Sequence, residues 1–302
     1  MESFSILTDT NSDLPQVFLD ENGILVVPIA FHIDGVQHSG GRWQEISDKE
    51  FYGALGAGSV AGTALANAEA FTEIFTDYAK RGEALLTVLL SSGLSGTYQN
   101  SLIALNEVKE KYPDCKIRTI DSLNAAGGAG LLTWLAVKKR AEGLSVDEAA
   151  DWLEEKKHSC LALFTVDDLM YLHRGGRLSK FQAIAGSIIG IKPLLNVAPD
   201  GTLKLKDKAR GRKAALETLA NQMKRSLKPD TSLDTVIISH SDCIEDAETL
   251  AGMIKSLVKV REFYLEMMGP VIGAHVGPGC VALFFEADMP RPEYEAKYYG
   301  DK

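Results

Sequence analysis

The sequence has few cysteines and no long apolar run, and both absences narrow the class of protein. Its four cysteines, Cys115, Cys160, Cys243 and Cys280, lie far apart, with no Cys-x-x-Cys pair and no Cys/His cluster of zinc-site spacing. We expect reduced, mostly buried thiols. No apolar stretch approaches the roughly 20 residues that span a bilayer, and no basic segment precedes an apolar run at the start of the chain. These features predict a cytoplasmic protein that does not insert into a membrane.

Positive charge is also scarce. Lys and Arg number 32 against 41 Asp and Glu, which gives a net charge of −9 at pH 7. Bulk electrostatics therefore argue against a nucleic-acid partner, and they leave room only for transient contact with a membrane. With 302 residues, of which 45% are apolar, the chain is long enough to form a core of normal size and two domains.

A strand, a loop of glycines and hydroxyls, and a helix follow one another in residues 84–112. The run from Ala84 to Leu90 is apolar, as in a buried strand, and the helical spacing that begins at Thr97 must end before Pro113. The loop between them directs backbone N–H groups, hydroxyls and a helix dipole toward one point, which is how proteins hold an anion. An ordinary βα connection has the same composition, so the loop alone does not decide between the two.

Two enzymatic motifs fail on this loop. A nucleophile elbow has the pattern Gly-x-Ser-x-Gly, but Ser95 is followed by Gly96 and then by Thr97 where the second glycine should stand. A nucleotide-binding P-loop needs a lysine, and none lies between Arg81 and Lys109. The loop is therefore neither motif.

Strands alternate with helices through the first half of the chain. Capping boxes at Ser47 and Ser145 predict two of the helix starts. The alternation predicts right-handed βαβ crossovers and a mainly parallel sheet. Because ligands of such sheets bind beyond the carboxyl ends of the strands, we expect the loops at Asp9, Ser95 and Asp121 to share one edge.

The second half of the chain follows a different pattern. The turn Pro199-Asp200-Gly201, between predicted strands at 191–197 and 202–206, indicates an antiparallel hairpin. We therefore predict an α/β protein with two α/β domains. Residues 1–159 form the first, with a mainly parallel sheet, and residues 160–302 form the second, with a mixed sheet.

Six segments occur in an order that is more specific than any one of them. They are Thr8-Asp9-Thr10-Asn11-Ser12-Asp13-Leu14, Ser91-Ser92-Gly93-Leu94-Ser95-Gly96-Thr97-Tyr98-Gln99, Leu172-His173-Arg174-Gly175-Gly176-Arg177-Leu178-Ser179, Ile191-Lys192-Pro193-Leu194-Leu195, Arg210-Gly211-Arg212-Lys213 and the glycine-rich stretch from Gly269 to Gly279. This set covers nearly the whole chain and resembles the DegV family, bacterial fatty-acid-binding proteins that serve a fatty acid kinase. The resemblance implies two α/β domains with a fatty acid in a tunnel between them.

The resemblance also implies which residues hold the fatty acid. Its carboxylate would be bound by Ser95 and His275, with Thr63 as a third contact. The neighbouring positions Gly96, Thr97 and Ala274 complete the predicted ligand-binding set. Thr63 matches only the first residue of the family's Thr-Ser-Gln-Pro-Ser-Pro segment, because Ala64, Leu65, Ala66, Asn67 and Ala68 follow it here. The loss of two hydroxyls and two prolines predicts a less polar and less rigid loop.

The residues themselves offer plainer interpretations. A lone histidine beside apolar residues is more often a satisfied core histidine, but three glycines surround His275 and would let the backbone approach a ligand closely. Asp9, Asp13 and Asp121 could be acids, metal ligands or helix caps, and capping is the interpretation we favour. We predict no metal site, because the carboxylates lack the number and spacing that one needs.

Two basic runs stand out in this acidic chain. One contains Arg174 and Arg177, and the other contains Arg210 and Arg212. Such runs are most often solvated faces. The resemblance implies an alternative, in which these cations flank the tunnel mouth and meet the kinase or its ATP phosphates. In that arrangement Asp9 and Asp121 lie behind the ligand-binding residues and hold them in place.

The sequence thus favours a carrier that is not itself an enzyme and needs no cofactor. It would bind a long-chain fatty acid as its ligand and present the carboxylate to a partner fatty acid kinase. One alternative is a serine hydrolase or acyltransferase using Ser95, His275 and an aspartate. Another is a phosphosugar-binding subunit of a kinase, which would use the same glycine loop. The apolar segment Phe181 to Ile191 suits an acyl chain better than a sugar.

Overall fold

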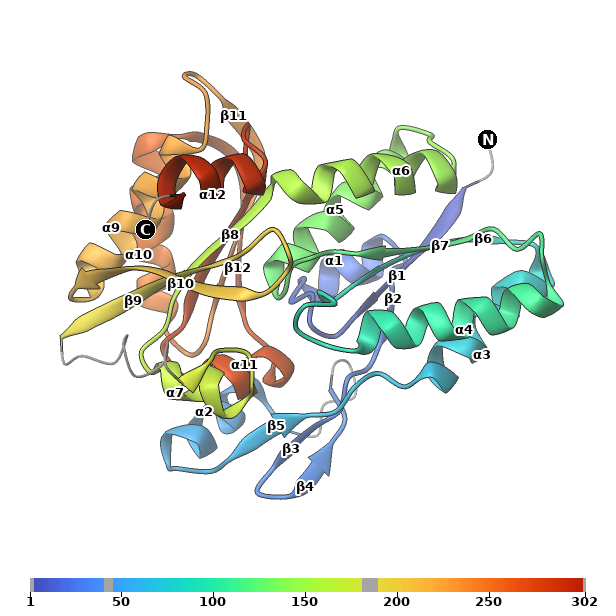
Figure 1. Cartoon of the computed structure of the whole chain (residues 1–302), viewed down its shortest axis with the longest axis horizontal. Helices are drawn as coiled ribbons and strands as arrows, with labels where there is room; N and C mark the ends of the chain where they lie inside the picture. Colours follow the sequence, from blue (N-terminus) through green and yellow to red (C-terminus); the bar gives the residue numbers. More distant parts are fainter. Residues whose placement is uncertain (1–2, 41–45, 181–189, 301–302) are drawn as a thin grey trace.

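Two sheets form the body of the protein (Figure 1). The computed structural model describes residues 3–40, 46–180 and 190–300. The first sheet is parallel throughout and has the order β2-β1-β6-β7. Its strands are β2 (Leu25–Val27), β1 (Phe4–Asp9), β6 (Ala84–Leu89) and β7 (Ile117–Asp121). The predicted parallel sheet is confirmed.

The second sheet is mixed and has the order β10-β9-β8-β13-β11-β12. Only β11 and β12 pair in parallel, and the other neighbours are antiparallel. The strands are β8 (Cys160–Thr165), β9 (Ile191–Val197), β10 (Leu203–Arg210), β11 (Ser232–His240), β12 (Lys259–Met267) and β13 (Val281–Glu286). The predicted mixed sheet and the β9–β10 hairpin are confirmed, while the apolar segment predicted at 181–190 falls almost wholly outside the described residues.

A third, small sheet corrects one sequence prediction. The apolar run from Ile24 to Phe31 predicts a single strand, but the chain leaves β2 at Val27, ahead of Pro28, and starts a new strand. The new strand β3 (Phe31–Ile33) pairs with β4 (Val36–His38) and β5 (Ala61–Thr63). Pro28 has no backbone N–H to donate to a sheet ladder, and β2 ends before it. This sheet matters for the site because β5 ends at Thr63.

Helices pack on both sheets, and one of them lies between the two (Figure 1). In the first half they are α1 (Gln16–Glu21), α2 (Asp48–Gly56), α3 (Ala68–Arg81), α4 (Thr97–Lys111), α5 (Gly127–Ala141) and α6 (Val146–Lys156). In the second half they are α7 (Leu169–Arg174), α9 (Arg212–Arg225), α10 (Ile244–Leu257), α11 (Pro270–Val276) and α12 (Arg291–Tyr299). The capping boxes predicted at Ser47 and Ser145 are both formed.

Helix α5 lies where the two sheets meet. It packs on β1 and β6 of the first sheet and on β8, β11 and β13 of the second. One apolar cluster consequently continues from the first sheet across α5 to the inner face of the second sheet. The outer face of the second sheet has its own cluster beneath α9, α10 and α12. All strands of the parallel sheet precede residue 122 and all strands of the mixed sheet follow residue 159, while the domain boundary between 159 and 160 stays a prediction.

Candidate functional site

Three loops meet at the carboxyl edge of the parallel sheet, as the strand order predicts. The Asp9 carboxylate after β1 accepts a hydrogen bond from the Leu90 N–H at 3.0 Å, and the Asp121 carboxylate after β7 accepts one from the Ser92 N–H at 3.1 Å. Both carboxylates therefore hold the loop that follows β6. The favoured interpretation as helix caps is wrong for Asp9 and Asp121, because the N–H groups they bind belong to loops.

Asp9 and Asp13 are held in unusual environments. Burial raises the pKa of Asp9, although the hydrogen bonds from Asn11 and Leu90 oppose this effect. Burial also raises the pKa of Asp13 well above its ordinary range. The Asp13 carboxylate accepts a hydrogen bond from the N–H of Gly269, the residue that precedes α11. Asp13 thus joins the loop after β1 to the helix that bears His275.

A pocket lies between the two halves of the chain, with about 710 Å³ of empty space that includes space open to solvent. Its walls come from both sheets, from the β6–α4 loop and from α11, and most of them are apolar. The polar side chains among the lining residues are Thr63, Ser95, Arg177 and His275. The pocket thus combines a long apolar wall with these four polar side chains, hereafter the polar group.

His275 and Thr63 are brought together from opposite ends of the chain. Thr63 Oγ1 lies 2.9 Å from His275 Nε2, at hydrogen-bonding distance, with the donor set by the imidazole tautomer. Burial, aided by the nearby Arg177 cation, lowers the pKa of His275 to about 4. The ring is therefore neutral at pH 7. Its Nδ1 has no hydrogen-bond partner among the described residues.

Ser95 lies on the loop that opens α4. Its Oγ is 3.0 Å from Thr97 Oγ1, and the Thr97 N–H donates to it at 3.3 Å. Gly96 is the residue that caps α4, and neither Gly96 nor Thr97 is among the lining residues. Among the described residues, Ser95 forms no hydrogen bond with His275. Ser95 is thus placed as a hydroxyl at the wall of the pocket.

Ala274 faces away from the pocket. Its side chain is buried among Phe31, Phe51 and Tyr52, in a cluster between α2, β3 and α11. The prediction that Ala274 binds ligand therefore has no support from its side chain. Adjacent residues of a helix point in different directions, so Ala274 turns away when His275 faces the pocket. The sequence pattern predicts no helix at this segment.

Arg177 lies in the pocket wall rather than on an outer face. Its Nε donates to the carbonyl of Leu94 at 2.9 Å, and another of its nitrogens donates to the carbonyl of Gly175. The side chain is half-buried, and burial lowers the pKa of its guanidinium. The family resemblance predicts that Arg177 faces the kinase with the other cations, whereas the structure places it in the same pocket wall as Ser95 and His275.

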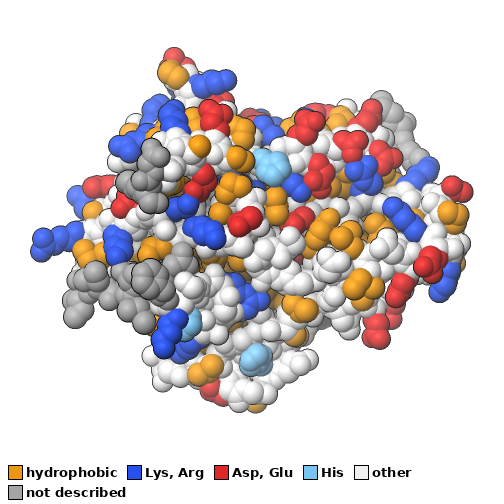
Figure 2. Space-filling model, viewed as in Figure 1, with side chains coloured by type: hydrophobic (Ala, Val, Ile, Leu, Met, Phe, Trp, Pro, Cys, Tyr) orange, Lys and Arg blue, Asp and Glu red, His pale blue; other side chains and the backbone are white. Residues whose placement is uncertain are grey.

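The other predicted cations occupy different positions. The Arg174 guanidinium is exposed and stacks over the Tyr171 ring, 4.4 Å from its centroid. Arg210 is exposed at the end of β10. Lys and Arg side chains gather around the β9–β10 hairpin on the left of the face in Figure 2. The surface near the hairpin is therefore basic although the protein is acidic.

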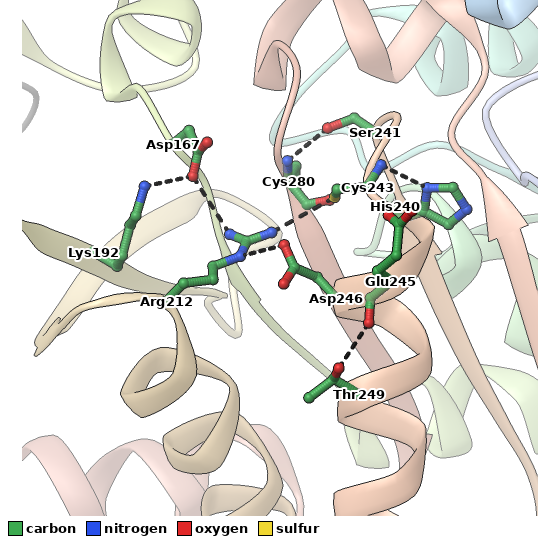
Figure 3. Close-up of polar contacts among 10 residues, drawn as sticks. All are labelled: Asp167, Lys192, Arg212, His240, Ser241, Cys243, Glu245, Asp246, Thr249 and Cys280. Carbon is green, nitrogen blue, oxygen red and sulfur yellow. Dashed lines mark hydrogen bonds and ion pairs between the residues drawn. The ribbon is translucent and has the colours of Figure 1, made fainter.

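Arg212 is engaged within the protein. Figure 3 shows its side chain between two carboxylates, with Nε donating to Asp246 at 2.8 Å and a terminal nitrogen 3.6 Å from Asp167. Asp167 also forms an ion pair with Lys192 at 2.6 Å. This network fixes the start of α9 against the end of β8. Cys243, 3.5 Å from the same guanidinium, is one of four free cysteines in the structure.

The glycines around His275 make room for protein side chains. A Cβ on Gly273 would lie 2.6 Å from the Tyr52 hydroxyl oxygen, and one on Gly277 would lie 2.4 Å from the Tyr171 ring. A Cβ on Gly175 would lie 2.2 Å from His275 Nδ1. The predicted reason for the glycines, close approach of backbone to ligand, is therefore replaced by close packing of α11 against α2 and α7.

The segment after Thr63 is held by hydrogen bonds in place of the missing prolines. The Ala64 N–H donates to the Ala30 carbonyl at 2.8 Å, and Asn100 Nδ2 donates to the Ala66 carbonyl at 2.8 Å. Asn67 then caps α3. Leu65, which stands where the family has a glutamine, is 49% exposed. The segment is less polar, as predicted, but its backbone is firmly tied.

In the described part of the chain, no group of three or more His, Cys, Asp and Glu side chains is placed to hold a metal ion. None of the described helices combines the length and the apolar character that crossing a membrane requires.

Comparison with known proteins identifies the family. A family model described as "Uncharacterised protein, DegV family COG1307" matches residues 3–288. The chain belongs to the DegV family. A DegV domain-containing protein of Clostridium perfringens is 40% identical to it over 97% of this chain and 100% of its own length.

Two solved structures have a similar fold. A hypothetical protein of Thermotoga maritima, whose structure is described as revealing a fatty-acid-binding function, has a TM-score of 0.83 at 27% identity and covers 95% of this chain and 100% of its own. The Fatty Acid Kinase (Fak) B3 protein of Streptococcus pneumoniae, solved with linoleic acid, has a TM-score of 0.81 at 19% identity, over 95% and 100% of the two chains. At that identity the second comparison shows the fold alone.

Sequence reasoning missed three residues of this DegV-family site. Gly175 makes room for His275, Asn11 links Asp9 to the Ala126 N–H at the pocket floor, and Arg291 joins the two halves behind the pocket. Gly175 and Asn11 belong to segments that carry the family resemblance, so the sequence marks these positions but does not indicate their contacts. Arg291 lies beyond the last of those segments.

Proposed function

We propose that this DegV-family protein binds a long-chain fatty acid in the pocket between its two halves and presents the carboxylate to a partner fatty acid kinase. The observation that carries the proposal is the chemistry of the pocket: a long apolar wall with Thr63, Ser95, Arg177 and His275 as its polar side chains. An amphiphile with one polar head matches this distribution. The relative from Thermotoga maritima, described as binding fatty acid, supports the same ligand class.

The apolar wall supplies the affinity. Burying a methylene contributes about 0.8 kcal/mol, so a tail of about 16 carbons contributes on the order of 10 kcal/mol before the cost of ordering it. The head supplies the orientation, because a carboxylate taken below the surface costs several kcal/mol unless donors meet it. The Ser95 hydroxyl, a neutral His275 and the Arg177 guanidinium are the donors available here.

The hydrolase alternative lacks the geometry of a triad. A serine nucleophile needs a histidine base at hydrogen-bonding distance and an acid to orient that base. Here Ser95 bonds Thr97, His275 bonds Thr63, and His275 Nδ1 has no partner among the described residues. Labelling of Ser95 by a fluorophosphonate probe would favour the hydrolase over the carrier.

Native mass spectrometry of the purified protein tests the ligand directly. We expect a stoichiometric long-chain fatty acid to remain bound after gentle purification, because the free energy of burying its tail alone corresponds to tight binding. His275→Ala should release it more easily, with about a 10- to 100-fold weaker affinity, because one hydrogen bond to a charged head is worth about 1.5–3 kcal/mol. Finding no fatty acid, even after incubation with mixed lipids, would exclude the proposed function.

Arg174 offers a test of the kinase step that leaves the pocket alone. Its guanidinium is exposed and stacks on the Tyr171 ring, and neither residue lines the pocket. We expect Arg174→Glu to reduce phosphorylation of bound fatty acid by the cognate kinase at least tenfold, because it places a negative charge on a surface proposed to meet that enzyme. Fatty-acid affinity, measured in parallel, should stay at the wild-type value. Unchanged phosphorylation would show that Arg174 is not at the docking surface. Arg177 is unsuitable for this test because it lines the pocket.

A further inference from the structure

The pocket extends away from its polar group along strand β13. Ala282 and Phe284, on one face of this strand, and Cys280, directly before it, all line the pocket. At about 3.3 Å per residue they span roughly 13 Å. Cys280 closely follows α11, the helix that bears His275, so Phe284 is the most distant of the three from the polar group.

Strand register places two more lining residues beside Phe284. Phe284 pairs with Ala162 on β8, and the pairing of Leu163 with Asn196 puts Val197 of β9 next to Ala162. Val197 in turn pairs with Leu203 on β10. Phe284, Val197 and Leu203, hereafter the far row, thus lie in one line across the sheet. All three are apolar and all three line the pocket.

The far row is where the pocket ends. The next residue on the same face of β13 is Glu286, which does not line the pocket and forms an ion pair with Lys156 at 2.6 Å. The Phe284 ring is wedged against the start of α5, because a Cβ on Gly127 or on Gly128 would lie 2.9 Å from one of its carbons. The Phe284 ring therefore has no space to move away from the pocket.

The hairpin that carries Val197 and Leu203 is held from two sides. Ser91 Oγ donates to the Gly201 carbonyl at 2.9 Å, and Arg291 donates to the Ala198 carbonyl at 3.3 Å. These bonds tie the β9–β10 turn to the first half of the chain and to α12. The wall formed by the far row is therefore fixed by contacts that do not depend on a ligand.

We propose that the far row sets the upper limit of acyl chain length and demands an apolar chain end. This specificity rests on the proposed function, because it presumes that the carboxylate lies at the polar group. A methyl end packs against Phe284, Val197 and Leu203, whereas a second carboxylate would lose its hydration there without gaining a donor. The ligand class is therefore monocarboxylic acids with a tail that ends at the far row.

Competitive loading measures the length limit. Purified protein is incubated with an equal mixture of saturated fatty acids that differ by two-carbon steps, and the bound species are identified by native mass spectrometry. In Leu203→Ala and Phe284→Val we expect the ratio of the next longer acid to the acid preferred by wild type to rise about tenfold, as for two newly buried methylenes. Leu205→Ala is the matched control, because Leu205 lies two residues along β10 on the same face and does not line the pocket. Its chain-length distribution should equal that of wild type.

The outcomes separate this proposal from the proposed function. If wild type takes up a defined set of fatty acids and both variants keep that set, the far row does not limit length and the proposal is overturned. If wild type takes up none, the proposed function falls and this proposal falls with it. Should Phe284→Val fail to fold, Leu203→Ala on the outer strand decides. As a second measurement, the α,ω-dicarboxylic acid of the preferred length should bind wild type at least about 100-fold more weakly; equal affinity would contradict an apolar end.

Discussion

Replacing Gly175 by alanine is expected to weaken fatty-acid binding about 10- to 100-fold and to leave the fold intact. The added Cβ would lie 2.2 Å from His275 Nδ1 and 3.1 Å from its Cε1, so the ring must move. The backbone tolerates alanine, because Gly175 has φ −71° and ψ −6°, in the helical region. A displaced ring loses its 2.9 Å contact with Thr63 and its place beside the carboxylate. Hydrogen bonds to charged groups are worth about 1.5–3 kcal/mol, which gives the stated range.

Isothermal titration of delipidated protein with fatty acid measures this effect. Gly252→Ala is the control, since Gly252 lies inside α10 with nothing within 4 Å of the added carbon, and its affinity should equal that of wild type. The effect should also depend on the ring. In a His275→Ala background the Gly175→Ala substitution should change affinity by less than about twofold, because nothing remains to displace. Wild-type affinity in Gly175→Ala would show that the position of His275 does not govern binding.

Local signals in the sequence were sufficient for much of the fold. The Ser47 and Ser145 capping boxes, the alternation of strands and helices, and the Pro199-Asp200-Gly201 turn between β9 and β10 all depend on neighbouring residues, and the structure confirms them. The meeting of the Asp9, Ser92 and Asp121 loops also followed from strand order, because parallel strands end at one edge.

Helix α11 shows where such reasoning stops. Its seven residues include Pro270, Gly273 and His275, which have low intrinsic helix propensity, so the segment reads as a loop. The helix forms because tertiary packing stabilises it: Gly273 admits Tyr52, and the Tyr52 hydroxyl donates to the Met268 carbonyl at 2.8 Å. A pattern that depends on a residue more than 200 positions away leaves no local periodicity.

Three of the predicted ligand-binding residues meet in one pocket, but their contacts were not predictable from the sequence. Ser95, Thr63 and His275 were identified through the family resemblance, and all three line one pocket. That Arg177 joins them, while Ala274 faces away, depends on the turn after α7 and on the rotation of α11. Neither is encoded in the spacing of residues along the chain. Arg291 and the whole of α12 carried no motif at all.

Arg291→Met is expected to lower the free energy of unfolding by about 3 kcal/mol. The side chain is only 2% exposed, and its guanidinium donates to three carbonyls: those of Leu123 and Lys157 at 2.6 Å and that of Ala198 at 3.3 Å. Two acceptors come from the first half of the chain and one from the β9–β10 turn. Removing the donor leaves these carbonyls buried and unpaired, at about 1–3 kcal/mol each. Part of this cost is offset, because burial also lowers the pKa of Arg291 and so disfavours its charged form.

Thermal unfolding measured with and without fatty acid tests this assignment and its link to the pocket. Lys297→Met on the exposed side of α12 is the control and should change the unfolding midpoint little, because an exposed lysine there contributes under about 1 kcal/mol. Since Arg291 holds the turn between Val197 and Leu203, its loss should also loosen the far row, so that the bound fatty acids become more varied in length. An Arg291→Met protein with the wild-type midpoint would show that the three carbonyls find other donors. A lowered midpoint with an unchanged ligand distribution would show instead that Arg291 stabilises the junction of the two halves without shaping the pocket.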